Sequence, residues 1–397
     1  MNLIPFPNEY GALLSQNLLA FTERAFYELH PNASFQDNWH LDVIASSLEA
    51  CRRGELTRLI LNKPPRYLKS HFVSVSFVAF VLGHNPAAKI ICASYGQDLS
   101  NKHASDCRTV MNAPWYREVF PNTELESPGS SLQELVTTKH GFRLATSVGG
   151  VLTGRGADFI IIDDPLRSEE ALSESRREAV NHWFDHTLYS RLDDKKRGRI
   201  IVVMQRLHAD DLMGHVLAME PWKAIRFPAI ADEDEIHVFS TPRGVRRVKR
   251  RAGEALHRER EPLEVLAQIR EVIGEYNFAS QYQQDPMPLG GGLVKTAWFK
   301  TYTTADVPAN FDLIFQSWDS ANKPTELSDY SVCSTWGVRE KHIYLLDVFR
   351  KRLGYPELKR AVRKQAEEFL PKIILIEDKG SGTQLIQELV NVGNARD

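Results

Sequence analysis

Two stretches of this sequence end an apolar run in a carboxylate. They are FIIIDDP at 159–165 and LIFQSWDSA at 313–321. A buried strand can deliver an acid to a metal ion at its exposed end, where the strand leaves the core. Asp163 and Asp319 therefore predict two metal-dependent sites on one chain.

A lysine and a hydroxyl follow an earlier apolar run, in NKPPRYLKSHF at 62–72. A strand, a tight loop, Lys69-Ser70 and then a helix would place backbone amides and an ammonium around phosphates, with the hydroxyl on magnesium. The loop lacks the glycines of the standard G-x-x-x-x-G-K-[ST] pattern. A Lys-Ser pair at a helix start is commonly an N-terminal cap, and for this loop alone that alternative stays open.

FIIIDDP strengthens the phosphate interpretation. In phosphoryl-transfer ATPases a hydrophobic strand ends in an Asp that holds magnesium, and the adjacent acid orients the attacking water. Asp163 fits the first role and Asp164 the second, although Asp164-Pro165 is also a common turn that ends a strand. A further run, RIIVVMQRL, predicts Gln205 and Arg206 at a strand end, where they would sense the γ-phosphate and stabilise transferring charge. A salt bridge from Arg206 to Asp210 or Asp211 is the alternative.

Alternating elements are expected to position these residues. Helical stretches at 98–111 and 173–191 lie between short β-rich runs, and this alternation is typical of a mostly parallel sheet flanked by helices. We therefore predict an α/β fold. The β-rich runs are 56–62, 89–95, 142–146, 159–163 and 199–204.

Composition narrows the class of protein. The 397 residues are 43% hydrophobic and 25% charged with a net charge of -2, so a nucleic-acid partner would need local basic patches. The four cysteines lie far apart without a C-x-x-C pair, which favours free thiols in a reducing compartment and disfavours a zinc knuckle. The longest apolar run, 72–83, is too short for a bilayer, so no membrane partner is expected.

Breaks in composition predict three parts of the chain. QQDPMPLGGG at 283–292 contains two prolines and three consecutive glycines, which mark a domain boundary. We predict a first part at 1–231, a charged linker at 232–292 and a further part at 293–397. The charged linker contains basic residues that would track DNA phosphates, or form a solvated hairpin instead. These residues are Arg246, Arg247, Lys249, Arg250 and Arg251.

The second acidic site is expected to involve two metal ions. Two divalent metals roughly 3.5 to 4 Å apart activate water in phosphodiester hydrolysis, so several carboxylates must converge. Asp319 ends one predicted strand, and Asp378 ends another in ILIED before a GSG loop. Asp347, in IYLLDVF, is a further candidate ligand, with a simple strand-end turn as its alternative.

Taken together, these residues resemble the large terminase subunit of tailed bacteriophages, a DNA-packaging motor and nuclease. The resemblance rests on the order and spacing of motifs along most of the chain. It implies a P-loop ATPase domain of the ASCE type at 1–231, a linker subdomain at 232–292 and a partial RNase H-like nuclease domain at 293–397. The motifs are FQDNWHLDVIASSLEA, LNKPPRYLKS, TSVGGVLTGRGADFIIIDDP, VVMQRLHADDL, FASQYQQDPMPLGGGLVK, QSWDSANKPTELSDYSV and IEDKGSGTQLIQEL.

The resemblance also implies a role for each matching residue. Lys69 and Ser70 would be the Walker A contacts to phosphate and magnesium, and Asp163 and Asp164 the Walker B acids. Gln205 and Arg206 fall in the coupling motif, where Thr-Arg is more usual. The remaining assignments are Arg66 as a phosphate contact, Arg155 as an arginine finger in cis or trans, Trp39 near the adenine or, alternatively, in the core, and Asp378 as a nuclease metal ligand.

Several partners are implied by the same resemblance. ATP and Mg²⁺ would serve the motor, and Mg²⁺ or Mn²⁺ the nuclease. Double-stranded DNA, the terminase small subunit and the procapsid portal would be partners of a homo-oligomeric ring in the bacterial host cytoplasm. The family's nuclease takes a further acid from a C-terminal helix, and no motif matches it before Asp397. We therefore expect an incomplete nuclease domain with weak or absent activity.

Two other functional classes stay open from the sequence. One is a helicase-like P-loop ATPase, which would separate strands. The other is an inactive prophage remnant that still binds DNA or the portal.

Overall fold

The computed structural model divides the chain into two compact units, Met1–Lys295 and Thr296–Asp397. The second unit begins close to the predicted boundary at residue 293, while the predicted linker belongs to the first unit. The functional division into three parts stays a prediction. The residues that the structure describes are 8–126, 131, 133–152, 154–219, 221–241, 244–286, 299–303, 307–308, 310–320, 331–351, 353–377 and 385–389.

A seven-stranded sheet forms the centre of the first unit, in the order β3-β4-β2-β5-β6-β1-β7. Neighbouring strands run parallel except β3, which is antiparallel to β4. The predicted mostly parallel α/β sheet is therefore confirmed. The strands are β1 (Arg58–Asn62), β2 (Lys89–Ser94), β3 (Glu134–Val136), β4 (Phe142–Ser147), β5 (Phe159–Asp163), β6 (Arg199–Met204) and β7 (Lys223–Arg226).

Helices cover both faces of this sheet because its central strands are apolar on both sides. On one face Ile161 and Ile201 belong to the larger core, which includes α1 to α6; on the other, Ile160 packs with α7 and α8. The helices are α1 (Asn8–Gln16), α2 (Leu18–Leu29), α3 (Trp39–Arg53), η1 (His71–Phe77), α4 (Val78–His84), α5 (Gln97–Asn112), α6 (Pro114–Val119), η2 (Ser168–Glu170), α7 (Glu174–Trp183), η3 (Phe184–Leu188), η4 (Tyr189–Arg191) and α8 (Leu212–Leu217).

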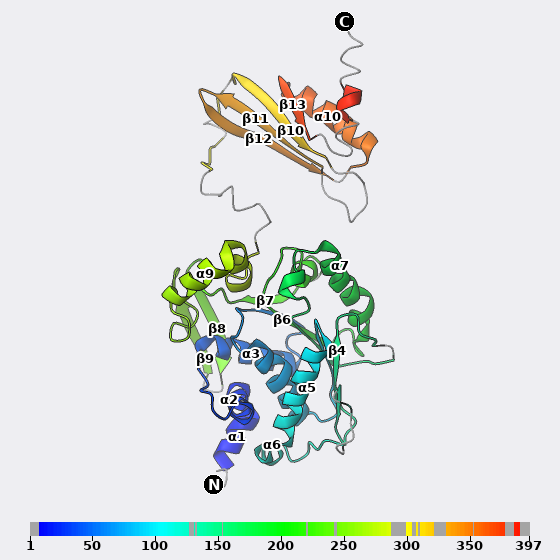
Figure 1. The fold of residues 1–397 in the computed structure, drawn as a ribbon, viewed down its shortest axis with the longest axis vertical. Helices are drawn as coiled ribbons and strands as arrows, with labels where there is room; N and C mark the ends of the chain where they lie inside the picture. The colour runs from blue at the N-terminus through cyan, green and yellow to red at the C-terminus, as the bar shows by residue number, and fades with distance from the viewer. Residues whose placement is uncertain are drawn as a thin grey trace. The chain divides into compact units, whose positions relative to one another are not determined.

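A two-stranded ribbon and a helical segment complete the first unit. β8 (Glu235–Thr241) pairs antiparallel with β9 (Gly244–Arg250), and β8 lies beside α3 (Figure 1). The buried ring of Phe239 joins the larger core and fastens the ribbon to it. The following segment contains α9 (Leu263–Asn277) and η5 (Phe278–Tyr282).

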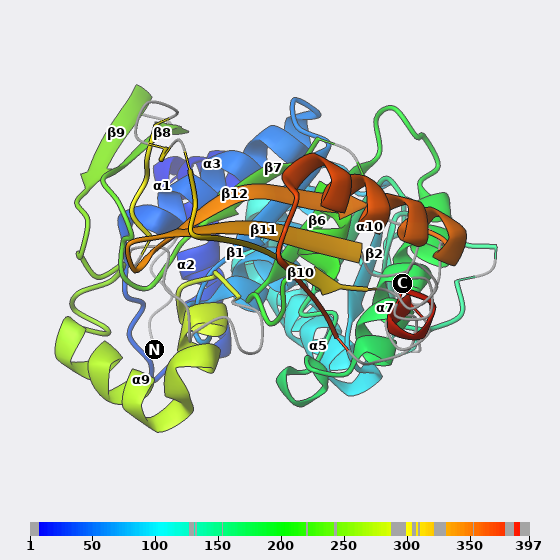
Figure 2. The same ribbon diagram turned by 90° about the horizontal axis from the view of Figure 1, so that it is seen from above.

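The second unit is a smaller mixed sheet with a helix on one face. Its order is β12-β11-β10-β13, with β10 antiparallel to β11 and parallel to β13. α10 (Tyr355–Phe369) lies along this sheet (Figures 1 and 2), where Leu358 and Val362 pack with Trp318 and Cys333. The strands are β10 (Leu313–Asp319), β11 (Ser331–Arg339), β12 (His342–Lys351) and β13 (Ile373–Ile376).

Membrane spanning has no support in the described part of the chain. None of the helices there combines the length and the hydropathy that a bilayer crossing needs.

Candidate active site

Three strand ends bring the predicted phosphate and metal residues together in the first unit. β5, β6 and β1 are neighbours and run parallel, so their carboxyl ends open at the same edge of the sheet. The residues at or just beyond these ends are Lys69, Ser70, Asp163, Asp164 and Gln205. The chain topology thus brings Lys69 and Gln205, which are 136 positions apart in the sequence, to the same edge of the sheet.

Lys69 is paired with the second acid in this structure. Its Nζ atom lies 2.8 Å from Oδ1 and 2.7 Å from Oδ2 of Asp164. Burial raises the pKa of Asp164, and the Lys69 ammonium opposes that rise. A phosphate that bound Lys69 would therefore compete with Asp164 for the same ammonium.

Asp163 is buried and held by hydroxyl groups. Ser70 donates to Oδ1 at 3.1 Å and Ser74 donates to Oδ2 at 2.6 Å. Burial raises the pKa of Asp163, and these hydroxyls act in the opposite direction. His103 on α5 places Nδ1 3.6 Å from Oδ2, and burial lowers its pKa to about 4, so its ring is neutral at pH 7.

Sequence reasoning did not find Ser74 or His103. Ser74 stands four positions beyond Ser70 in η1, a π-helix, and His103 comes from another helix altogether. Short π-helical segments are frequent at functional sites. The apolar residues around Ser74 in the sequence gave no reason to expect a polar role for it. The structure supplies the reason, because Ser74 lies on the side of η1 that faces Asp163.

The loop between β1 and η1 adopts backbone conformations that usually require glycine. Arg66 has φ 67° and Leu68 has φ 62°, both in the left-handed region. Asp164 also has a positive φ of 45°. Each such residue costs about 1–3 kcal/mol and persists only where its surroundings hold it. The loop is therefore tight although it lacks glycine. Its conformation depends on contacts with neighbouring residues.

A cavity of about 710 Å³ opens in front of this loop. This volume is within the range of small-molecule sites, about 300–1,000 Å³. Its charged lining suits an anion, because cationic side chains outnumber the single carboxylate, Asp164. The cationic residues are Arg66, Lys69, Lys102 and Arg260, and the lining also includes Ser70, Gln205 and His40.

The donor set also fits magnesium. A serine hydroxyl and a carboxylate, Ser70 and Asp163, are hard oxygen ligands within 3.1 Å of each other, and Mg²⁺ in nucleotide sites keeps the remaining positions for water and phosphate. The Lys69 ammonium beside them suits a phosphate oxygen. These residues therefore fit a magnesium-bound nucleotide.

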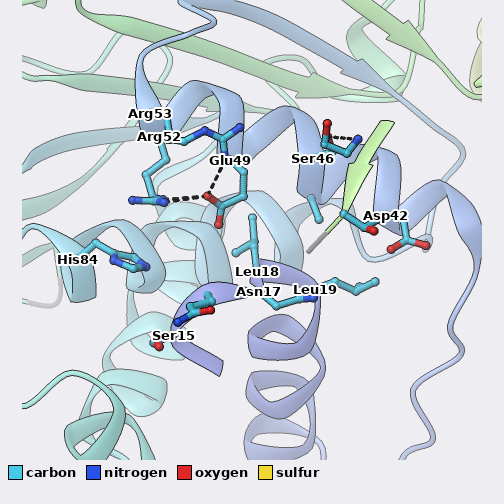
Figure 3. A pocket seen from close by; sticks show the side chains of 14 residues that line it. Ser15, Asn17, Leu18, Leu19, Asp42, Ser46, Glu49, Arg52, Arg53 and His84 are labelled. Carbon is cyan, nitrogen blue, oxygen red and sulfur yellow. Dashed lines mark hydrogen bonds and ion pairs between the residues drawn. The ribbon is translucent and has the colours of Figure 1, made fainter. Parts of the chain in front are cut away.

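A second cavity of about 440 Å³ lies elsewhere, between the α1–α2 junction, α3 and the end of β8 (Figure 3). Its two arginines, Arg52 and Arg53, are both paired with Glu49. It contains none of the lysine, hydroxyl and carboxylate groups described above. We therefore assign the candidate active site to the loop cavity.

Gln205 and Arg206 separate in space although they are adjacent in sequence. Gln205 lines the cavity; its backbone N–H donates to Asp164 Oδ1 at 3.4 Å and its amide donates to Ser168 at 3.2 Å. The Arg206 guanidinium instead binds Asp211, with Nε 2.9 Å from Oδ2, and donates to two loop carbonyls. The ion-pair alternative thus describes Arg206 in this structure, and its sensor role stays a prediction.

The other nucleotide-site predictions differ in placement. Arg66 is exposed and lines the cavity. Arg155 does not line it; its guanidinium makes two hydrogen bonds to Glu134, at 2.8 and 3.0 Å. Trp39 packs against Phe227 and its ring centroid lies 4.7 Å from that of His237, whereas its neighbour His40 reaches the cavity. The roles assigned to these residues stay predictions.

The predicted DNA-binding residues lie on two sides of the β8–β9 ribbon. Arg250 is buried, pairs with Glu235 at 3.4 Å and donates to three backbone carbonyls, so it is not available to a phosphate. Arg246 pairs with Asp42 at 2.8 Å. Arg247, Lys249 and Arg251 are exposed. The structure therefore corrects the predicted set by removing Arg250, which fastens the ribbon.

The predicted nuclease acids are not gathered in the described residues. Asp319 is exposed at the end of β10 and pairs in register with Val332, whereas Asp347 pairs with Thr335. Because side chains alternate along a strand, residues 332 and 335 point to opposite faces, and so do the two acids. Asp378 lies outside the described residues. No group of three His, Cys, Asp or Glu suited to a metal occurs among those described.

Comparisons with known proteins gave matches only among solved structures. No family model and no curated protein matches the chain. Structures of phage large terminases match it over most of its length.

The matches share little sequence with this chain. The large terminase of bacteriophage HK97 is 14% identical with a TM-score of 0.45, over 96% of this chain and 78% of that one. The large terminase of a thermophilic bacteriophage, in complex with ADP, is 10% identical with a TM-score of 0.35, over 87% and 80%. The ATPase domain of the Thermus phage P74-26 large terminase is 14% identical with a TM-score of 0.38, over 65% and 95%.

Lys63, at the start of the loop, is a buried lysine that sequence reasoning missed. It is 1% exposed, and its Nζ atom has no hydrogen-bond partner among the described residues. Burial lowers its pKa to about 7, and the positive charge of Lys69 acts in the same direction. An unfolded lysine has a pKa of about 10.4. Between these two values the unfolded chain holds a proton that the folded chain does not.

This difference predicts the effect of Lys63→Met on stability. Stability rises with pH wherever the unfolded state binds more protons, so the wild-type chain should gain stability as pH rises from about 7 to about 10.4. At pH 7 the burial of Lys63 lowers the stability of the wild-type chain. Lys63→Met removes this cost and should raise the Tm at pH 7 by at least about 3 °C. Thermal unfolding of both proteins at pH 7 and pH 10 checks it. A Tm difference that does not shrink at pH 10 would contradict the assignment.

Proposed function

We propose that this chain is an ATP-hydrolysing DNA-packaging motor of the large-terminase type. The supporting observation is the meeting of Lys69, Ser70 and Asp164 in one cationic cavity, with the buried Asp163 accepting a hydrogen bond from Ser70. The strand β6 between β1 and β5 agrees with the ASCE-type arrangement expected from the sequence resemblance.

In the proposed mechanism each residue acts on a defined part of the nucleotide. Lys69 leaves Asp164 and binds a phosphate oxygen. Ser70 and Asp163 would hold magnesium, which would neutralise charge on the phosphates. Asp164, released from Lys69, orients the attacking water and accepts its proton. Gln205, whose backbone N–H donates to Asp164 at the cavity wall, is placed to respond to the γ-phosphate.

Double-stranded DNA is the proposed cargo, with the terminase small subunit and the procapsid portal as proposed partners of a ring of chains. The exposed side of the β8–β9 ribbon supports a DNA contact. On it Val238 pairs with Arg247 and Ile236 with Lys249, which alternates apolar and cationic side chains. Such a surface would bind phosphates without sequence preference, as a translocating motor needs.

Neutralising this surface should weaken DNA binding in a salt-dependent way. Replacing Arg247, Lys249 and Arg251 by Gln removes up to three phosphate contacts, so the slope of log K against log salt should fall by about 0.9 for each. Fluorescence anisotropy with a labelled duplex at several salt concentrations measures it. Arg246→Gln is the control, because Arg246 is already paired with Asp42. An unchanged slope in the triple variant would show that DNA binds elsewhere.

A metal-dependent nuclease in the second unit stays a proposal from the sequence resemblance. It now rests on Asp319 and Asp378, because the strand register separates Asp347 from Asp319. Manganese-dependent nicking of plasmid DNA that persists in Asp319→Ala would exclude Asp319 as a ligand.

A further inference from the structure

Tyr67 occupies an unusual position in the nucleotide loop. It stands between Arg66 and Leu68, two residues of this loop whose φ angles are positive. It is 2% exposed, and its ring packs against the imidazoles of His40 and His257, with centroids 5.8 and 6.4 Å away. A strained loop needs surroundings that hold it, and Tyr67 is its buried anchor.

The hydroxyl of Tyr67 connects this loop to a distant segment of the chain. It donates to Oε2 of Glu261 at 2.8 Å, across 194 positions of sequence. The neighbouring Arg260 places its guanidinium over the tyrosine ring, 5.4 Å from the centroid. Glu261 lies just before α9, in the last part of the first unit.

The loop after β6 is fastened to the same segment. The backbone N–H of Arg206 donates to Oε1 of Gln284 at 3.0 Å, and the hydroxyl of Tyr276 donates to the carbonyl of Leu207 at 3.4 Å. Both loops that border Asp164 therefore have contacts with residues 257–286, the helical segment that precedes the second unit in sequence.

We propose that Tyr67 is a positioning residue, through which Glu261 and the segment 257–286 set the affinity of the cavity for nucleotide. The inference rests on the proposed function. Lys69 is two residues from Tyr67, so release of the tyrosine hydroxyl lets the loop relax and moves the ammonium away from the phosphates. The segment thus acts on nucleotide binding through the loop, in addition to the direct lining of the cavity by its residues His257 and Arg260.

Tyr67→Phe tests this with minimal change, because it removes the hydroxyl and keeps the ring. The full-length variant should bind ADP about tenfold more weakly, equivalent to about 1.4 kcal/mol. Its KM for ATP should rise by a similar factor while kcat stays within twofold. Tyr116→Phe is the matched control: Tyr116 is also fully buried and donates to a carbonyl, that of Ala79 at 2.8 Å, outside the cavity. It should lower the Tm but leave ADP affinity unchanged.

Glu261 variants separate the contact from general destabilisation. Glu261→Ala should weaken ADP binding as much as Tyr67→Phe, and the double variant no further. Glu261→Gln retains an acceptor and should restore most of the affinity. If Tyr67→Phe does not fold, the Ala and Gln variants carry the test.

Two results would overturn the proposal. One is an ADP affinity within twofold of wild type in Tyr67→Phe and Glu261→Ala, and the other is losses that add in the double variant. A wild-type chain that binds no ADP would instead overturn the proposed function itself.

Discussion

Lys69→Met is expected to lower the affinity for ADP about a hundredfold, because it removes the buried ammonium that a phosphate would bind. The same substitution leaves Asp164 without its partner, so burial would raise the pKa of that carboxyl further. The variant should therefore also be less stable. Isothermal titration with ADP measures the affinity, and thermal unfolding measures the stability.

A matched control exists in the same unit. Lys89 also pairs with an aspartate, Asp193, at 3.0 Å, but that pair is exposed and does not line the cavity. Lys89→Met should leave ADP affinity unchanged. Equal affinities in Lys69→Met and wild type would mean that the cavity is not a phosphate site.

Asp164→Asn is expected to separate binding from turnover. The carboxylate that would orient the water and take its proton is lost, so ATP turnover should fall by about 10²- to 10⁴-fold. ADP affinity should rise, because Lys69 no longer has an acid 2.7 Å from its Nζ atom. The two changes have opposite signs, which general damage to the fold would not produce.

Steady-state turnover and an ADP titration on the same preparation check this prediction. Weaker ADP binding in Asp164→Asn would contradict the competition between Asp164 and phosphate for Lys69. Turnover at the wild-type rate would remove Asp164 from the proposed mechanism.

Local sequence patterns predicted the residues at the strand ends. Asp163 and Asp164 follow four residues, Phe-Ile-Ile-Ile, that are buried on β5, and a central parallel strand needs such a run. Parallel pairing then brings the ends of neighbouring strands to one edge without further information. The lysine, hydroxyl and carboxylates were therefore predictable together.

Contacts between distant segments were not predictable in the same way. Ser74, His103 and Tyr67 face the site from elements whose packing is decided by tertiary structure. Tyr67 is the clearest case, since its partner Glu261 comes from the segment before α9. No local pattern marks such a pair.

Charge patterns were informative only in part. The basic run in β9 predicted a cationic surface, yet alternation along the strand directs Arg250 into the protein, where it binds Glu235 and three carbonyls. In the second unit, strand register sends Asp347 to the face opposite Asp319. A charge in a sequence does not reveal which face of a strand carries it.

The most direct test of the proposed motor is magnesium-dependent release of phosphate from ATP by the purified full chain, with and without linear double-stranded DNA. We predict release by the wild-type protein that DNA stimulates, and its loss in both Lys69→Met and Asp164→Asn. No release by a folded wild-type chain in the presence of magnesium and DNA, or equal release by the two variants and the wild type, would contradict the proposed function.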